Sequence, residues 1–562
     1  MLLISYLKNH RKKNSMQASI PQVMGTEHEY IITIPDPNID QLSRWREEEE
    51  RAIKLLKEIK KRFYPNLNEL KRSENLIRTL REAYLEIHPR TTSRELTSIT
   101  SEEFEEIFAY QGYMTPLGGR FYIDHIYFEG ATPECDDPFT LLACELAQEE
   151  LIVKVFGELF ENDPMRPRLY KNISDGKGNS QAAHRNFCVS KELWKKIVSP
   201  LTRTCKISPA LARETKILAT WHGVEPILTG AGKYGLENPR SSEPLSHPPK
   251  LQLSGRADFI EFITGIDTTR LRPLINQRHE PLADYKKFGR YHCICGDANR
   301  AEWPYLFKMG LLAILLGMLE DDAVSLDFFA ADPVTALKRV SKDTVFSQEI
   351  EIAYFFKKAG STLPALQILR AFLKDMGKYL ASRETPEWCG KIYDKAVWAV
   401  EALENNSKEI GRVLDWKIKD RLIGIRLNAF NHHLNYHALY SPTLSYKIYC
   451  DNDLIERVIS RDLVQKYSNE PPERTRAYFR AQFLKHFYES VLFCATDWQN
   501  ITLYESPTLS PGPLITRLSE PLQLTKKECG NIFELEVSPE ARFEMVRALL
   551  EKARPTKERK NG

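Results

Sequence analysis

Several short segments alternate polar and apolar residues with the period of a β-strand. In GGRFYIDHIYF, Arg120, Tyr122 and Asp124 share one face, while Phe121 and Ile123 share the other, because residues two apart in a strand point the same way. The same period pairs polar side chains on three further predicted strands: Glu27 with Glu29, His184 with Asn186, and Arg290 with His292. We therefore predict four strands, each with one apolar and one polar face.

Other segments carry the helical period. Residues 44–63 are amphipathic and charge-rich, with Glu before Lys at helical spacing, and a second helix is predicted over 138–160. The apolar run 305–319 is too short to cross a bilayer, which takes about 20 residues, and predicts a buried helix. Further strands are expected at 168–172, 184–190 and 289–296, and most of the chain after residue 300 reads as helical up to the Pro-rich stretch 506–513.

The chain also contains segments that fit neither period. Residues 1–23 predict a mobile N-terminal extension, and we expect no signal peptide because the charges follow the short apolar run at the start. Residues 36–117 are polar and lie between two predicted strands, which indicates an inserted excursion. The basic end KARPTKERK is typical of a solvated tail.

Composition narrows the class of protein. With 562 residues, 42% of them hydrophobic, the chain is globular, and roughly 150 residues per domain would give three or four domains. A net charge of +3 argues against general nucleic-acid binding. Ten cysteines are too few for a disulfide scaffold, so we expect reduced thiols in the cytoplasm. Nothing in the pattern predicts a membrane protein.

The polar faces of the predicted strands are rich in residues that bind metals and phosphates. Each face alone could be a solvated surface, but its residues are Glu, Asp, Tyr, His, Asn and Arg rather than Lys, Thr and Ser. If Glu27, Glu29, Asp124 and Glu129 converge, carboxylates 4 Å apart repel by roughly 4 kcal/mol at an effective dielectric near 20. Such a group needs cations, and its oxygen-rich ligands fit Mg or Mn. The arginines would then face nucleotide phosphates.

Weaker motifs leave alternatives open. The lone CxC of Cys293 and Cys295 predicts buried structural thiols, because no second pair lies at zinc spacing. DGKG and GAGKYG lack the P-loop pattern and predict plain turns. Arg476 and Arg480, one helical turn apart, could bind an anion or form surface ion pairs. Trp498 could be a core residue or a platform for an adenine ring, and the core is the simpler expectation.

Taken in order, these segments resemble the family that contains the Pup ligase and the Pup deamidase/depupylase, relatives of glutamine synthetase. The resemblance spans most of residues 24–505 and rests on GTEHEY, GGRFYIDHIYFEGATPEC, LYKNISDGKGNSQAAHRNF, LTGAGKYG, LQLSGRADFIE, RPLINQRHEPLAD, RYHCICGDAN, VLDWKIKDRL and EPPERTRAYFR. It implies an α+β fold, a glutamine synthetase-like curved antiparallel sheet cradle backed by helices. The domains would be a catalytic domain over 24–485 and a small C-terminal domain over 486–562.

The resemblance also implies roles for individual residues. Asp124 would be the catalytic carboxylate. The metal ligands would be Glu27, Tyr122, Glu129, His184 and His292, and the residues contacting ATP would be Arg120, Ala131, Thr132, Asn186, Arg290 and Trp498. Two features depart from the family pattern. The segment IYFEGAT replaces the family's usual His-Pro-Glu-Tyr neighbourhood, and Arg185 stands where the family usually has Glu. On a strand, Arg185 would point away from His184 and Asn186.

Within the family, the long excursion 36–117, the five-residue step from Asp124 to Glu129, and the DGKG and GDAN strings resemble the hydrolase more than the ligase. We expect an ATP- and Mg-dependent amidohydrolase, with ATP or ADP plus phosphate as a bound cofactor. Its partners would be a small disordered ubiquitin-like, Pup-like modifier and its conjugates, and a bacterial proteasome is a further implied link. The alternatives are an ATP-consuming ligase that joins the modifier to lysine and a catalytically degenerate nucleotide-binding regulator.

Overall fold

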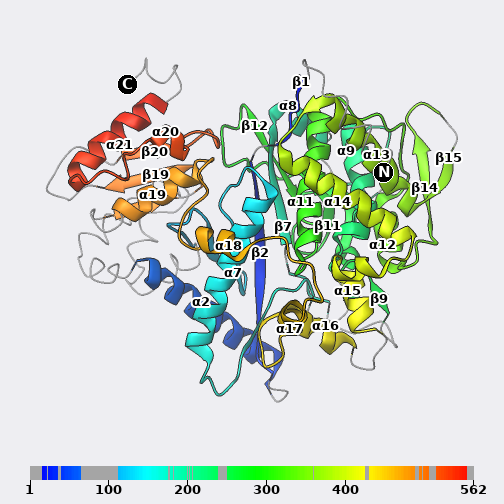
Figure 1. Cartoon of the computed structure of the whole chain (residues 1–562), viewed down its shortest axis with the longest axis horizontal. Coiled ribbons are helices and arrows are strands. Elements are labelled where there is room, and N and C mark those ends of the chain that lie inside the picture. The colour runs from blue at the N-terminus through cyan, green and yellow to red at the C-terminus, as the bar shows by residue number, and fades with distance from the viewer. Residues whose placement is uncertain are drawn as a thin grey trace.

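The computed structural model describes residues 16–21, 23–35, 39–64, 112–174, 178–181, 183–198, 200, 203–205, 207–237, 250–357, 360–424, 429–487, 493–496, 498–504 and 514–553. These residues form an α+β fold in which one large sheet runs through the middle of the molecule, helices lie on one side, and a smaller C-terminal unit lies at the edge (Figure 1).

The large sheet has ten strands, and β2 (Met24–Thr33) lies near its centre. Its neighbours are β5 on one side and β7 on the other, both antiparallel to it. All strand pairs in this sheet are antiparallel except β10 with β11. The strands are, in sheet order, β10 (Ile260–Gly265), β11 (Arg272–Asn276), β12 (Phe288–Cys293), β7 (Ala183–Ser190), β2, β5 (Tyr127–Ala131), β4 (Arg120–Asp124) and β3 (Tyr113–Met114). In addition, β6 (Arg168–Tyr170) pairs with the C-terminal end of β2, and β17 (Ala438–Tyr440) pairs with β6.

The prediction of one continuous strand through GGRFYIDHIYF is wrong. The chain turns back after β4, and Asp124 pairs with Tyr127 across a two-residue loop. His125 in this loop has a φ of 53°, in the left-handed region that a continuous strand cannot contain. The predicted faces of β4 are nevertheless correct, because Phe121 and Ile123 are buried behind the sheet.

Helices cover the apolar back of the sheet. The helix predicted at 138–160 is α7 (Pro138–Phe160), which begins after the Asp137 side chain caps the amides of Phe139 and Thr140. The helix predicted at 44–63 is α2 (Gln41–Phe63), and its Leu55, Leu56 and Ile59 pack with α7 against Phe121 and Phe128. The described start of the excursion 36–117 therefore lies behind the sheet, and residues 65–111 lie outside the described part of the chain.

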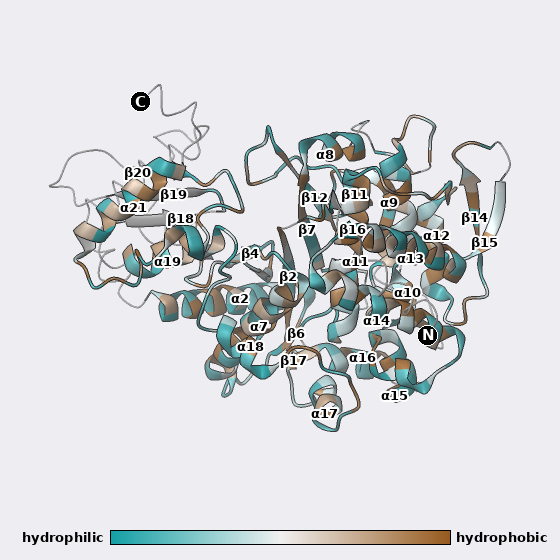
Figure 2. Ribbon diagram, turned by 45° about the horizontal axis from the view of Figure 1, so that its top comes forward, coloured by the Kyte–Doolittle hydropathy of each residue, from teal (hydrophilic) through white to brown (hydrophobic). Residues whose placement is uncertain are grey.

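The largest core lies behind β7 and β12. Its centre is α11 (Glu302–Glu320), the buried helix predicted at 305–319. Among the described residues it is the one helix long and apolar enough to cross a membrane, and 94% of its most apolar window is buried. The surrounding helices carry both hydrophilic and hydrophobic residues (Figure 2), and their hydrophobic side chains join this core: α8 (Lys191–Val198), α9 (Arg213–Val224), α10 (Pro226–Thr229), α12 (Pro333–Lys342), α13 (Ala365–Ser382) and α14 (Glu387–Glu404).

Smaller elements complete the main body. They are the sheet of β13 (Phe328–Ala330), β14 (Glu349–Tyr354) and β15 (Gly360–Pro364), the pair β8 (Lys233–Tyr234) and β9 (Leu251–Gln252), and the helices α15 (Asp415–Leu422), α16 (Ala429–His437), α17 (Ser445–Asp451) and α18 (Arg461–Tyr467). Part of the predicted mobile extension 1–23 is packed against the main body, and residues 1–15 lie outside the described part of the chain. Met16–Gln17 (β1) pairs with Arg383–Glu384 (β16), and Ile20 is buried against Gly317.

The C-terminal unit has its own hydrophobic cluster. Phe479 and Phe483 of α19 (Ala477–Phe487) pack against Phe533, Phe543 and other buried side chains of the last 60 or so residues. The unit's other elements are β18 (Phe493–Thr496), β19 (Asn500–Tyr504), β20 (Leu514–Arg517), α20 (Lys526–Cys529) and α21 (Pro539–Ala553). Because α19 contributes to this cluster and runs through the predicted boundary at 485, we propose that the unit begins at α19.

Candidate functional site

The strand registers place six of the predicted site residues in two adjacent rows on the face of the sheet opposite the helices. In the first row, Glu27 of β2 lies between Ala131 and His184, and Arg120 follows beyond Ala131. In the second row, Glu129 lies between Glu29 and Tyr122. Directly paired residues of neighbouring strands share a face, so residues that are distant in sequence meet here.

Glu27, His184 and His292 form the first group of potential metal ligands, each with a ligand atom within 4.8 Å of the others. Nδ1 of His184 lies 3.3 Å from Oε2 of Glu27, and Arg290 donates to Oε1 of Glu27 at 3.1 Å. Both ring nitrogens of His292 and Nε2 of His184 are buried without a hydrogen-bond partner. Buried polar atoms are rarely left unpaired, so the donor set suits a metal ion.

The charges of this group favour neutral imidazoles beside an ionised carboxylate. Burial alone would raise the pKa of Glu27, but Arg290 and His184 outweigh it and lower that pKa to about 2. Burial, together with Arg290 and His184, holds the pKa of His292 well below its usual value. Neutral imidazole is the form that binds metals.

Glu29, Asp124 and Glu129 form the second group, again with ligand atoms within 4.8 Å of one another. Two unit charges at that separation repel by about 3.5 kcal/mol at an effective dielectric near 20. Burial and the neighbouring Glu29 raise the pKa of Glu129 well above its usual value. The Tyr122 hydroxyl donates to Glu129, and burial raises the pKa of this phenol. A divalent cation would relieve the repulsion among these carboxylates.

Asp124 differs from its two partners in exposure. Its side chain is 47% exposed, whereas Glu129 is buried. It ends β4 just before the turn at His125. Asp124 is therefore the carboxylate of this group that an incoming molecule can reach.

A cavity of about 90 Å³ opens beside the first row. Five of the six predicted ATP-contacting residues line it, namely Ala131, Thr132, Asn186, Arg290 and Trp498; Arg120 does not. Its apolar lining residues include Val23, Pro281 and Leu282, while Arg290 and Glu27 lie at the metal-ligand group. Trp498 therefore lines a cavity, in addition to contacting the C-terminal hydrophobic cluster.

The surface ion-pair alternative for Arg476 and Arg480 is wrong. Both side chains are buried, and both donate to the carboxylate of Glu134. Glu134, Leu282 and Arg476 line the cavity, yet none was among the predicted site residues. The one-turn spacing of the two arginines was the available signal, but burial and partners depend on packing with residues over 300 positions away.

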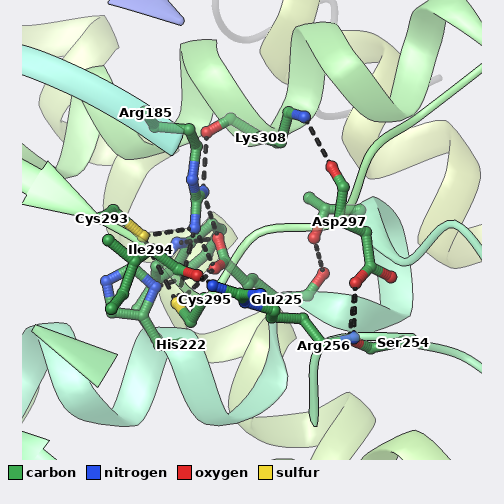
Figure 3. Close-up of polar contacts among 12 residues, drawn as sticks. Arg185, His222, Glu225, Ser254, Arg256, Cys293, Ile294, Cys295, Asp297 and Lys308 are labelled. Carbon is green, nitrogen blue, oxygen red and sulfur yellow. Dashed lines mark hydrogen bonds and ion pairs between the residues drawn. The ribbon is translucent and has the colours of Figure 1, made fainter. Parts of the chain in front are cut away.

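Arg185 points to the back of the sheet, as predicted, and joins a buried polar cluster there (Figure 3). Its guanidinium donates twice to Glu225, at 2.9 and 2.7 Å, and contacts Sγ of Cys293 at 2.7 Å. Cys293 and Cys295 are buried, with their sulfurs 3.3 Å apart. The prediction of buried thiols is confirmed, and Arg185 leaves the site face of β7 to His184 and Asn186.

This cluster also contains the types of side chain that hold zinc. His222, Glu225, Cys293 and Cys295 have potential ligand atoms within 4.8 Å of one another. The polar atoms of His222 and Glu225, however, already have partners. Trp221 and His222 also bond to Glu225, and Nε2 of His222 lies 2.6 Å from the Tyr291 hydroxyl. The Arg185 guanidinium, bonded to Glu225 and close to Sγ of Cys293, supplies positive charge within this group of potential ligand atoms.

Comparisons with known proteins show which family the chain resembles. The family model described as "Pup-ligase protein" matches residues 22–502. A Pup deamidase/depupylase of Mycolicibacterium smegmatis is 30% identical over 416 residues, covering 70% of this chain and 77% of that protein. A Pup–protein ligase of Kribbella flavida is 28% identical over 415 residues, covering 69% and 83%.

A solved structure shares the fold over almost the whole chain. The crystal structure of the complex between the prokaryotic ubiquitin-like protein Pup and its ligase PafA superposes with a TM-score of 0.70 and 22% identity, covering 95% of this chain and 93% of that one. The predicted α+β, glutamine synthetase-like fold is confirmed. The chain therefore belongs to the family of Pup ligases and Pup deamidases/depupylases.

Proposed function

We propose that this protein is an ATP- and Mg-dependent amidohydrolase that deamidates a Pup-like modifier, cleaves its isopeptide bond to protein lysines, or does both. The observation that carries the proposal is the exposed carboxylate of Asp124 beside two buried carboxylates, in a site where Nε2 of His184 and both ring nitrogens of His292 are buried without a hydrogen-bond partner. Relatives named for deamidation and depupylation, at up to 30% identity, support the hydrolytic direction.

The residues present fit divalent metal ions. Glu27, His184 and His292 would hold one ion, and Glu129, with Tyr122 beside it, would take part in a second site next to Glu29. Bound Mg would polarise the carbonyl under attack and screen the carboxylates from one another. Unpaired histidine nitrogens and crowded carboxylates are both costly without such ions.

The residues that line the cavity suit a nucleotide. The apolar wall of the cavity and Trp498 would take the base, because aromatic rings stack on nucleobases. Arg290, at the other end, would contact the phosphates, with Asn186 held by the arginine at 2.7 Å and Thr132 and Ala131 completing the wall. A Pup ligase structure in complex with ADP, 23% identical with a TM-score of 0.65, supports nucleotide binding. The bound species would be ATP, or ADP with phosphate.

Asp124 would act directly on the amide carbon or on a water molecule. In the first case its carboxylate forms a covalent bond to the carbonyl carbon; in the second it takes a proton from water. In both cases the C–N bond breaks and the amide nitrogen takes a proton to leave as ammonia or as a lysine amine. In the first case water then hydrolyses the anhydride formed with Asp124; in the second the hydroxide adds to the carbonyl carbon and gives the free carboxylate directly. The turn at His125 fixes where Asp124 stands, and the exposed side chain leaves room for a peptide end.

The test compares wild type with Asp124→Asn. Substrates would be a Pup-like modifier ending in Gln and a modifier joined to a lysine, with products followed by mass spectrometry in the presence of ATP and Mg. Asp322→Asn is the matched control, because that aspartate is 85% exposed in another part of the molecule and has a positive φ that Asn tolerates. We expect cleavage by wild type and the control only.

Two other outcomes would overturn the proposal. Stoichiometric release of ADP coupled to conjugate formation would show a ligase, the activity named for several relatives at 28% identity. Failure of wild type to act on any such substrate while still binding nucleotide would indicate a regulator. A small disordered Pup-like modifier and its conjugates as partners, a link to a bacterial proteasome and a cytoplasmic location belong to the same proposal.

A further inference from the structure

Glu134 is a carboxylate enclosed by two arginines. Its Oε1 accepts from Nε of Arg476 at 2.9 Å and from Nη1 of Arg480 at 3.2 Å, and its Oε2 accepts from Nη2 of Arg480. Arg480 is fully buried, Arg476 is 3% exposed, and the Glu134 side chain is 12% exposed. Two positive charges thus face one negative charge. Each guanidinium has five N–H groups, so both arginines have donors left for other acceptors.

Those remaining donors bind backbone carbonyls in separate parts of the chain. Arg480 donates to Gly118 at 2.9 Å and to Trp498 at 3.2 Å. Arg476 donates to Leu282 at 2.6 Å and to Leu518. Gly118 lies in the turn before β4 with a φ of 87°, and a side chain there would crowd Ala477 at the start of α19. The arginines therefore connect the sheet, the loop before β12 and the C-terminal unit.

Most of these connected parts line the cavity proposed to hold the nucleotide. Glu134, Leu282, Arg476, Trp498 and Pro521 are all lining residues. The amide of Arg476 donates to the Pro521 carbonyl at 2.9 Å, and the Arg480 guanidinium lies 5.2 Å from the centre of the Trp498 ring. Three walls of the cavity, which come from distant parts of the chain, are fastened to the same pair of side chains.

We propose that Glu134, Arg476 and Arg480 form a buried clamp that fastens the C-terminal unit to the sheet and thereby shapes the base-binding end of the nucleotide cavity. They are positioning residues, because the wall they set includes Trp498 and Leu282. The inference rests on the proposed nucleotide function. Without the clamp, Trp498 would not be held against the cavity before the nucleotide binds. Part of the binding free energy of the nucleotide would then be used to order Trp498, and the affinity would fall.

Replacing Arg480 with lysine distinguishes the effect of the positive charge from the effect of the guanidinium's hydrogen-bonding geometry. A planar guanidinium reaches Glu134, Gly118 and Trp498 together, whereas an ammonium group is a compact point charge that cannot hold all three. Arg480→Lys keeps the charge balance and loses the fastening. Glu134→Gln is the second variant, because it keeps the shape and removes the charge that holds both arginines.

Arg474 and Asp136 provide matched controls in the same two segments. They form an ion pair at 2.9 Å with Arg474 79% exposed, and neither lines the cavity. The experiment measures dissociation constants for ADP and for inorganic tripolyphosphate by calorimetry in wild type, Arg480→Lys, Glu134→Gln, Arg474→Lys and Asp136→Asn. Melting temperatures are recorded alongside, and binding is measured well below them.

We expect Arg480→Lys and Glu134→Gln to weaken ADP binding about ten-fold, equivalent to about 1.4 kcal/mol, with the affinity for tripolyphosphate unchanged. Tripolyphosphate has no base, so its binding should not depend on this wall. Hydrogen exchange in residues 518–526 should be faster in both variants than in the controls. Both controls should bind ADP as wild type does.

The clamp inference fails if the two variants melt earlier but bind ADP as tightly as wild type, since the arginines would then only stabilise the fold. It also fails if ADP and tripolyphosphate weaken equally. A wild type that binds neither ligand would instead refute the proposed nucleotide function, and the clamp with it. The two failures are therefore distinguishable.

Discussion

Replacing Arg185 tests whether this arginine stabilises the back of the sheet in place of a metal ion. In Arg185→Met, Glu225 loses two charge-assisted hydrogen bonds at 2.7 and 2.9 Å and remains buried, with its side chain 4% exposed. Removing one partner of a buried ion pair typically costs about 3–5 kcal/mol. Trp221 and His222 still donate to Glu225, so we expect a loss near the lower limit, about 3 kcal/mol.

The assay is thermal unfolding of wild type, Arg185→Met, Glu225→Gln and the double variant. With an entropy of unfolding of about 2.1 cal/mol/K per residue, a loss of 3 kcal/mol lowers the melting temperature of a chain this long by about 3 °C. The double variant should lose less than the sum of the single losses, because it leaves no unpaired charge. Arg412→Met is the control, because its partner Asp453 is 89% exposed and such pairs contribute roughly 0–1 kcal/mol.

A melting temperature for Arg185→Met equal to that of the Arg412→Met control would refute this reasoning, as would strict additivity in the double variant. Rescue of Arg185→Met by zinc, with the metal retained on the protein, would show that the cluster accepts a metal once the guanidinium is gone. Arg185→Glu should be the most damaging change, because it would place a second carboxylate against Glu225.

Further predictions concern the site and the buried charges. His292→Asn should weaken Mn²⁺ binding, measured by calorimetry, at least about ten-fold, whereas His125→Asn should not, since that ring is 67% exposed. Lys419→Met should lower the melting temperature by several degrees, because the buried ammonium donates to the carbonyls of Ala231 and Gly232 and each unsatisfied acceptor costs about 1–3 kcal/mol. The folded pKa of Glu134 is lowered from 4.5 to about 2, so its stabilising effect, on the order of 3 kcal/mol, is present above pH 4.5 and lost as the pH falls towards 2. The stability difference between wild type and Glu134→Gln should shrink over that window.

Each of these three predictions has a result that would contradict it. Equal Mn²⁺ affinity in the two histidine variants would remove His292 from the metal site. An unchanged melting temperature for the lysine variant would mean that water or another group satisfies the freed carbonyls. A stability difference between wild type and Glu134→Gln that is constant with pH would mean that Glu134 is not held as a carboxylate by its arginines.

The sequence alone determined which side chains share a face. The alternation in β4 is set by the local geometry of an extended chain, so Arg120, Tyr122 and Asp124 could be placed together without knowledge of any partner strand. Helix limits were equally local for α7, which begins and ends at the predicted residues, because its cap Asp137 directly precedes the segment and its apolar pattern lies within it. Family motifs then supplied residue roles that periodicity could not.

Only the tertiary structure decided which faces meet and which charges are buried. The turn at His125 splits one predicted strand in two and brings Glu129 opposite both Tyr122 and Glu29. Arg480 lies 346 positions from Glu134 along the chain, so no local pattern could have revealed their contact. Periodicity depends on neighbouring backbone angles and can be read along the chain, whereas burial and ion pairing depend on contacts between distant residues that exist only once the chain has folded.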